Sequence, residues 1–437
     1  MSAGMKHANA PTLRTWVFAG GQDRANDLCE GLKPANVKAE PASVDAIVHG
    51  PWMVDTILID RTTLGLEETA RICRKVRDND ALASTGVCVL ANDHDEELLA
   101  DAIISERAAN GLAARLRATA RRARVRDEAM TRAQTLRKST GGGTLDVGAP
   151  QRPALFFGAP SPGFLSLTRA MRSRNRESIA AFTTSTAFDY LNSDDVSGLV
   201  IDADALGQQA EDFCSLLKRS PRLYHVPVIL IGEETSWSRD RLINGDVLDR
   251  LDPLEPAASQ AVRVERLLAE ADMASALRDR LETQRDASIT DPGTRLFTAE
   301  FLVAHLQSQL DRHAMTGREL SVVAFQMRGP EGRPSPRVFS QAAQLLRALV
   351  RAEDVPARLD WSTMLVVTPG VGAAGADIAA QRLADALDAT VFDTANGDVA
   401  VGLTAYWSTA AAKPGQDAAS LLREAARGVA AVQTSAA

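Results

Sequence analysis

This chain of 437 residues has few cysteines, no long apolar run and no excess of positive charge. The four cysteines, Cys29, Cys73, Cys88 and Cys214, are far apart and form no CxxC pair, which argues against a zinc site and a disulfide framework. No run of 18 or more apolar residues occurs, so we expect a soluble, cytoplasmic protein without membrane insertion. The formal net charge of −7 disfavours a nucleic-acid-coating role. The length predicts about three domains. We expect no metal ion and no cofactor.

The N-terminal half of the chain contains an internal repeat. Residues 54–65, VDTILIDRTTLG, match residues 196–207, VSGLVIDADALG, with Val, Ile-Asp and Leu-Gly at the same spacings. Further apolar runs match at similar offsets: RTWVFAG (14–20) with RPALFFG (152–158), and GVCVLA (86–91) with PVILIG (227–232). Helix-like stretches follow these runs, a pattern typical of βαβ units around a buried parallel sheet. The repeat therefore predicts an α/β protein with two tandem doubly wound domains.

Two long helices and a linker are predicted around the second repeat. Residues 115–126, RLRATARRARVR, predict a basic helix whose arginines form a solvated face, with binding of an anion or a partner as the alternative. Residues 138–153 are rich in Gly and Pro and predict a linker. Residues 255–284 predict a connecting helix that could also pair with its copy in a homodimer. The apolar seam of that helix comprises Val262, Leu267, Leu268, Leu277 and Leu281.

A third domain with a mixed α/β pattern is predicted after the connecting helix. Its expected strands are SVVAF, TMLVV and VAVGLTA, separated by helical stretches. The predicted domains are therefore residues 10–137, 151–285 with the connecting helix, and 286–437.

Each repeat resembles a response-regulator receiver domain. An apolar strand ends in Asp60 in the first repeat and in Asp202 in the second, where a receiver carries its phosphoacceptor. The resemblance implies flavodoxin-like folds and a place in two-component signalling. Phosphotransfer, however, also needs an acidic pair for Mg²⁺, a hydroxyl group and a lysine that neutralises the acyl phosphate.

Those further receiver residues are missing from both repeats. No lysine occurs between Lys75 and Lys138 or between Lys218 and Lys413. The positions of the acidic pair read Ala19-Gly20-Gly21 in the first repeat and Gly158-Ala159-Pro160 in the second. The hydroxyl position reads Ala91 and Gly232, and the Lys-Pro position of the second repeat reads Asp252-Pro253. We therefore predict two degenerate receivers that mediate dimerisation and partner docking. Asp60 is the only candidate phosphoacceptor, and structural hydrogen bonding by the strand-end carboxylates is the alternative interpretation.

Residues 288–437 resemble the GGDEF domain of diguanylate cyclases. The stretch opens with TDPGTRLF (290–297), continues with the strand SVVAFQMR (321–328) and ends with VAVGLTAYW. Two receivers followed by such a domain is the layout of a class of cell-cycle regulators. That resemblance implies an adaptor, located at a cell pole, that helps to deliver a regulator to a ClpXP-type protease.

The catalytic residues of a cyclase are replaced. Cyclase chemistry requires carboxylates that hold two metal ions on the GTP phosphates. The first-strand positions of these ligands read Gln326 and Arg328, and the signature reads Asp360-Trp361-Ser362-Thr363-Met364. Two glycines have thus become Asp and Trp, and two acidic positions have become Ser362 and Thr363. We predict no catalytic residue and no enzyme activity; a residual diguanylate cyclase is the alternative.

An R-x-x-D motif, Arg351-Ala-Glu-Asp354, precedes the altered signature by five residues. In GGDEF proteins a motif in this register binds the product, cyclic di-GMP, and a second arginine follows the hairpin; Arg382 stands at that position. Arginine can grip a guanine edge or a phosphate, and a carboxylate can accept from guanine N–H groups. Because R-x-x-D also occurs at residues 24–27, 77–80 and 124–127, only the register is informative. Cyclic di-GMP is the predicted ligand; surface ion pairing and a ligand-independent scaffold are the alternatives.

Overall fold

The protein forms two compact units in the computed structural model. The model describes residues 12–50, 52–91, 99–104, 111–140, 149–193, 196–220, 223–233, 247–285, 288–394 and 400–436. The first unit comprises Met1–His49, Val54–Ala123 and Val147–Leu277, and the second comprises Gly50–Met53, Arg124–Asp146 and Arg278–Ala437. None of the helices searched within the described ranges is long and apolar enough to cross a membrane.

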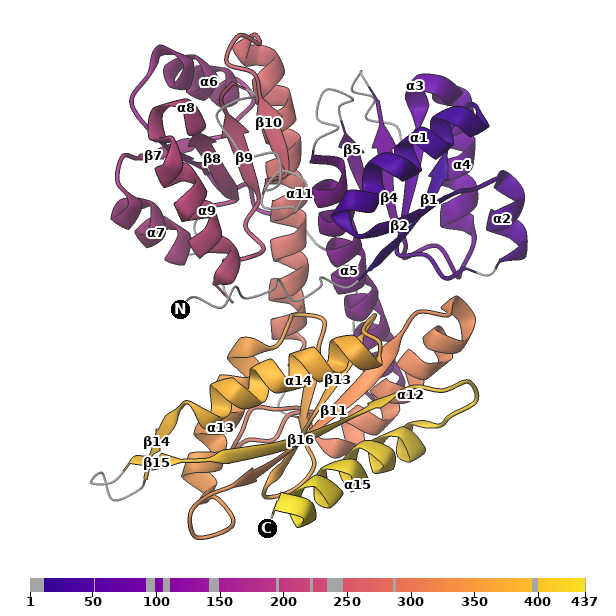
Figure 1. The fold of residues 1–437 in the computed structure, drawn as a ribbon, viewed down its shortest axis with the longest axis vertical. Coiled ribbons are helices and arrows are strands. Elements are labelled where there is room, and N and C mark those ends of the chain that lie inside the picture. Colours follow the sequence, from indigo (N-terminus) through magenta and orange to yellow (C-terminus); the bar gives the residue numbers. More distant parts are fainter. Residues whose placement is uncertain are drawn as a thin grey trace. The chain divides into compact units, whose positions relative to one another are not determined.

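The first unit contains a parallel sheet with the strand order β2-β1-β3-β4-β5 (Figure 1). Its strands are β1 (Leu13–Phe18), β2 (Val37–Pro41), β3 (Thr56–Asp60), β4 (Gly86–Leu90) and β5 (Ala102–Ile104). Its helices are α1 (Gln22–Leu32), η1 (Lys33–Ala35), α2 (Val44–His49), α3 (Arg61–Leu64), α4 (Leu66–Asp78) and the first part of α5 (Leu112–Thr140), whose residues from Arg124 onward belong to the second unit. Every residue of β3 and β4 is buried, as the continuous apolar runs predicted.

A second parallel sheet in the same unit repeats this topology, with the order β10-β9-β8-β6-β7. Its strands are β6 (Ala154–Phe157), β7 (Ser178–Ala181), β8 (Gly198–Asp202), β9 (Val228–Ile231) and β10 (Asp249–Leu251). Its helices are α6 (Pro162–Arg172), α7 (Thr184–Asn192), α8 (Ala203–Leu206), α9 (Gln208–Arg219) and α11 (Ala257–Thr283). Counted from its own first strand, each sheet has the order 2-1-3-4-5 of doubly wound domains. The prediction of two parallel-sheet α/β domains is confirmed.

The prediction that the arginines of the basic helix, residues 115–126 of α5, form a solvated face is wrong. Arg115 on α5 is only 3% exposed, and both its terminal nitrogens donate to Glu270 of α11 at 2.9 Å. Arg122 pairs with the same carboxylate at 2.9 Å. On α11, Leu267 and Leu268 of the predicted seam are buried in a core with the second sheet. These two leucines are thus covered within the chain, and a homodimer would have to use other residues.

The second unit contains an antiparallel sheet with the order β12-β13-β11-β16. Its strands are β11 (Leu320–Arg328), β12 (Val355–Arg358), β13 (Thr363–Pro369) and β16 (Thr404–Ala411), with a separate pair, β14 (Val391–Asp393) and β15 (Ala400–Gly402). Its helices are α12 (Ala299–Thr316), α13 (Pro336–Leu349), α14 (Ala373–Asp388) and α15 (Ala418–Ala436). The predicted strand VAVGLTA is divided between β15, which pairs with β14, and β16, which pairs with β11.

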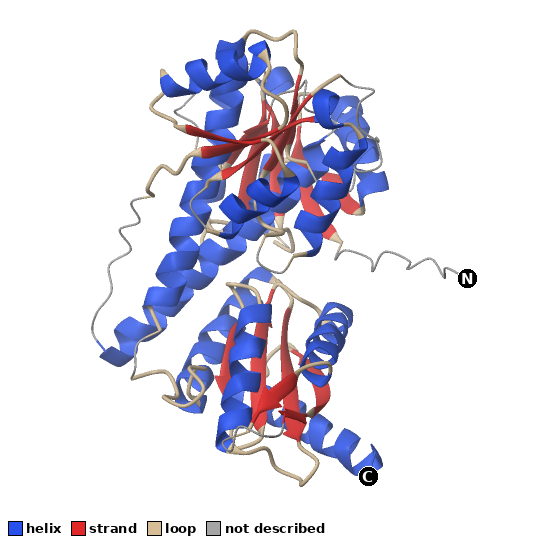
Figure 2. Ribbon diagram, turned by 90° about the vertical axis from the view of Figure 1, so that its left-hand side faces the viewer, coloured by secondary structure: helices blue, strands red, loops and turns tan. Residues whose placement is uncertain are grey.

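Helices cover both faces of this sheet (Figure 2). In β11, Val322 and Ala324 face the core formed with α12 and α15. Val323 and Phe325 face the opposite core, formed with α13 and α14. This alternation is the consequence of the two-residue period of a strand. The predicted mixed α/β character of the C-terminal region is confirmed.

Candidate ligand-binding site

The R-x-x-D motif forms a closed turn between α13 and β12. The amide of Arg351 donates to Asp354 Oδ2 at 2.9 Å, and the amide of Asp354 donates to the Arg351 carbonyl oxygen at 3.1 Å. Asp354 is 7% exposed and Glu353 is 4% exposed. The Asp354 carboxylate is therefore buried and holds the turn through the main chain.

The charges of Arg351 and Arg382 both act on the Asp354 carboxyl group of this turn. Burial raises the pKa of Asp354 to about 7, and the neighbouring Glu353 carboxylate adds to this effect. The charges of Arg351 and Arg382 act in the opposite direction and lower the pKa of Asp354. Arg382 is an exposed residue of α14, which lies beside α13 (Figure 1). One buried carboxyl group thus lies within electrostatic reach of two arginines that solvent can reach.

The altered signature forms a hairpin that is stabilised by its own side chains. Asp360 Oδ1 accepts from the amides of Ser362 at 2.8 Å and Thr363 at 2.9 Å. The Arg358 guanidinium lies 4.7 Å from the centroid of the Trp361 ring. Its Nε donates to the Asp360 carbonyl oxygen at 3.0 Å. Asp360 therefore stabilises the turn rather than pointing a free carboxylate at a ligand.

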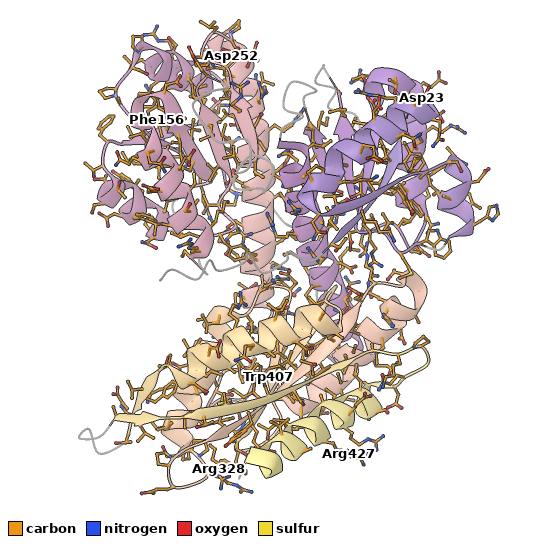
Figure 3. All side chains as sticks on the ribbon, viewed as in Figure 1. Asp23, Phe156, Asp252, Arg328, Trp407 and Arg427 are labelled. Atoms are coloured by element: carbon orange, nitrogen blue, oxygen red, sulfur yellow. The ribbon has the colours of Figure 1, made fainter. Side chains whose placement is uncertain are left out.

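The two strands that would carry the metal ligands of a cyclase, β11 and β13, are paired in the sheet. Gln326 of β11 is the cross-strand partner of Thr363 of β13, so their side chains are neighbours on one face of the sheet. Arg328, labelled in Figure 3, follows at the exposed end of β11. An amide, a hydroxyl group and a guanidinium are poor substitutes for the carboxylates that Mg²⁺ prefers. Among the described residues, no three His, Cys, Asp or Glu side chains are grouped to hold a metal.

The opening motif of the third domain, residues 290–297, is joined to this hairpin by a hydrogen bond between Asp291 and Arg358. Asp291 Oδ1 accepts from the amide and the hydroxyl group of Thr294, both at 2.8 Å. Asp291 Oδ2 accepts from Arg358 Nη1 at 2.9 Å. Burial would raise the pKa of Asp291, but these hydrogen bonds outweigh it and lower the pKa below its ordinary value. Arg358 was not among the predicted site residues, and its only signal in the sequence was its position in the spacer before the signature.

Asp60 at the end of β3 is fully enclosed. It is 0% exposed, and its Oδ2 accepts from Arg24 Nε at 2.8 Å. Its Oδ1 accepts from the amide and the hydroxyl group of Thr62, at 3.1 and 2.5 Å, and so caps α3. These bonds favour the interpretation of Asp60 as a structural carboxylate. Arg24, which belongs to one of the chance R-x-x-D patterns, was missed as its partner.

The corresponding site of the second sheet is similar but more open. Asp202 Oδ1 accepts from the amide of Ala205 at 3.0 Å and caps α8, and burial raises the pKa of Asp202. A Cβ atom on Gly158 would lie 2.5 Å from the Cβ of Asp202. Asp252, labelled in Figure 3, accepts from the amide of Leu254 at 2.9 Å. It therefore shapes the turn before α11.

Comparison with known proteins identifies the third domain. Residues 335–435 match the family profile described as "Diguanylate cyclase, GGDEF domain". Similar structures include the FimX GGDEF domain from Pseudomonas aeruginosa (17% identity, 33% of this chain and 94% of that chain, TM-score 0.31). Others are the GGDEF domain of DgcB from Caulobacter crescentus in complex with c-di-GMP (13%, 35% and 90%, 0.32) and diguanylate cyclase SiaD in complex with its activator SiaC from Pseudomonas aeruginosa (18%, 40% and 70%, 0.32). No curated protein matches the chain.

The chain is thus an α/β protein with two parallel-sheet domains and an antiparallel C-terminal domain. Its residues 335–435 are a GGDEF domain.

Proposed function

We propose that the protein is a cyclic di-GMP effector whose GGDEF domain binds the ligand without making it. The observation that carries this proposal is the turn of Arg351 and Asp354, directly before the signature hairpin and within electrostatic reach of Arg382. The carboxylate would accept from guanine N–H groups, and the guanidinium groups would bind the guanine edge or the phosphates. Because its own hydrogen bonds close the turn, little ordering would be needed on binding.

The absence of synthesis is the second part of the proposal. Gln326 and Thr363 stand together where two metal ions would have to be held. Neutral side chains there would leave the developing charge of phosphoryl transfer without compensation. A residual cyclase is the alternative that this part opposes.

The two N-terminal domains are proposed to be degenerate receivers. Their strand order, 2-1-3-4-5, supports a flavodoxin-like class, and the enclosed Asp60 supports a docking role rather than phosphotransfer. The layout resembles that of PopA, a cyclic di-GMP effector. On that resemblance we propose a cytoplasmic homodimeric adaptor that acts at a cell pole in ClpXP-type, cell-cycle-regulated proteolysis.

The test of ligand binding is calorimetry of the full chain with cyclic di-GMP. Removing a charged partner from a hydrogen-bonded site costs about 2 to 5 kcal/mol, so Arg351→Ala should weaken binding by at least roughly thirtyfold. Arg382→Ala should weaken it less, because Arg382 is more exposed. Arg337→Ala is the matched control, since Arg337 is an exposed arginine of the same domain. Equal effects of Arg351→Ala and Arg337→Ala, or no binding by the wild-type chain, would favour the ligand-independent scaffold.

A further inference from the structure

An exposed tryptophan stands at the tip of the β12–β13 hairpin. Trp361 is 64% exposed, and Leu359 beside it is 38% exposed. Tryptophan and arginine are enriched among the residues that dominate protein interfaces, whereas a large exposed indole contributes little to folding. This position therefore requires an explanation other than core packing.

The guanidinium of Arg358 packs over the ring of Trp361. The guanidinium lies 4.7 Å from the Trp361 ring centroid and 5.7 Å from that of Phe339. Its nitrogens are fixed by the Asp360 carbonyl oxygen and by Asp291 Oδ2, at 3.0 and 2.9 Å. Because one face of the indole already rests on a fixed group, a partner would lose little entropy in ordering it.

Three segments meet around Arg358 and give the surface its charge. The Ser340 hydroxyl group of α13 donates to the Gly293 carbonyl oxygen at 2.6 Å, which joins the opening motif to α13. Arg295 in that motif and Arg337 on α13 are exposed. Neither makes an ion pair with another described residue. We call Leu359, Trp361, Arg358, Arg295 and Arg337 the tip surface.

The carboxylates of this region make their hydrogen bonds with other groups. Asp291 is engaged by Arg358 and Thr294, and the Asp360 carboxylate, which keeps its charge, accepts from the turn amides. The tip surface thus combines a fixed aromatic group with two exposed arginines that make no ion pair among the described residues, in a chain whose formal net charge is −7.

We propose that the tip surface docks an acidic segment of a partner protein that carries an aromatic or aliphatic anchor. The anchor would pack on the open face of Trp361 and on Leu359, and the partner's carboxylates would pair with Arg295 and Arg337. A nucleic-acid strand fits less well, because such binding relies on many phosphate contacts from basic side chains. The inference does not depend on cyclic di-GMP binding, which would occur at the other end of β12.

The test is fluorescence anisotropy of the full chain with a panel of labelled peptides. The panel contains varied sequences of Glu and Asp with Leu and Phe anchors, the same sequences with Lys in place of the acidic residues, and an oligothymidine. Acidic peptides should bind most tightly, and Trp361→Ala should weaken that binding by at least roughly tenfold. Trp361→Phe should retain most of it. The double variant Arg295→Ala, Arg337→Ala should weaken it and reduce its salt dependence.

Val391→Ala is the control for this experiment, because Val391 is a 65% exposed apolar residue on another hairpin of the same domain. The proposal is wrong if no acidic peptide binds more tightly than its basic counterpart, or if Trp361→Ala and Val391→Ala behave alike. Tighter, Trp361-dependent binding of the oligothymidine would also overturn it and favour a single-stranded nucleic acid.

Discussion

Lowering the pH should weaken cyclic di-GMP binding, because the proposed binding mode uses the ionised form of Asp354. Burial, followed by the repulsion of Glu353, raises the pKa of Asp354 to about 7. If the protonated form cannot accept from guanine N–H groups, the apparent affinity is proportional to the ionised fraction. That fraction falls from about nine tenths at pH 8 to about one tenth at pH 6, so the affinity should fall by about tenfold. Calorimetry at fixed ionic strength measures this change directly.

Two variants separate this effect from general pH sensitivity. Asp354→Asn should bind weakly at every pH, since its amide group does not titrate. Glu353→Gln removes the nearby repulsion, lowers the pKa of Asp354 and should shift the loss of binding to lower pH. The reasoning is refuted if the wild-type affinity is constant between pH 6 and 8, or if Asp354→Asn keeps the wild-type pH dependence.

The same pKa has a consequence for the stability of the ligand-free chain. Between the unfolded pKa of about 3.9 and the folded value of about 7, the native state binds more protons than the unfolded state. Stability is therefore lost as the pH rises through this window, by up to ~4 kcal/mol for this group. Asp354→Asn, whose amide oxygen can still accept from Arg351, should accordingly raise the melting temperature at pH 8. The difference should disappear near pH 4.

The remaining predictions concern catalysis and two buried ion pairs. The purified chain should make no cyclic di-GMP from GTP with Mg²⁺ or Mn²⁺, measured by chromatography; turnover that is lost on Thr363→Ala would contradict this. Arg24→Ala should lower the free energy of unfolding in urea by about 1 to 3 kcal/mol, because it leaves a hydrogen-bonding oxygen of the buried Asp60 without its charged partner. Arg115→Ala should cost about 1 to 3 kcal/mol, since it removes the buried one of the two arginines that pair with Glu270. For both, Arg337→Ala is the exposed control, and a cost no larger than that of the control would count against the reasoning.

The sheets were predictable because their signals are local. Strands such as Thr56–Asp60 and Gly198–Asp202 are continuous apolar runs, and burial on both faces demands such runs. The position of the R-x-x-D motif before the signature hairpin was also visible in the sequence, since it depends only on chain order. The closed turn, with Arg351 and Asp354 joined through the main chain, was not.

The ion pairs were not predictable from the sequence pattern. An arginine-rich helix reads as solvated unless its partner is known, and the partner of Arg115 is Glu270, on a helix that follows another domain. The same is true of Arg24, which neutralises Asp60 across 36 residues of sequence. In both cases the determining contact is long-range, so no window of sequence contains it.

Two glycines limit which side chains can stand just after β1 and β6. A Cβ atom on Gly20 would lie 2.4 Å from the Thr63 carbonyl oxygen, and one on Gly158 would lie 2.5 Å from the Cβ of Asp202. A side chain at either position therefore collides with the main chain of α3 or with the last residue of β8. Single substitutions that place a carboxylate at Gly20 or Gly158 should be unfavourable unless the neighbouring residue shifts. A mutational route to an acidic side chain at these two positions therefore needs more than one change.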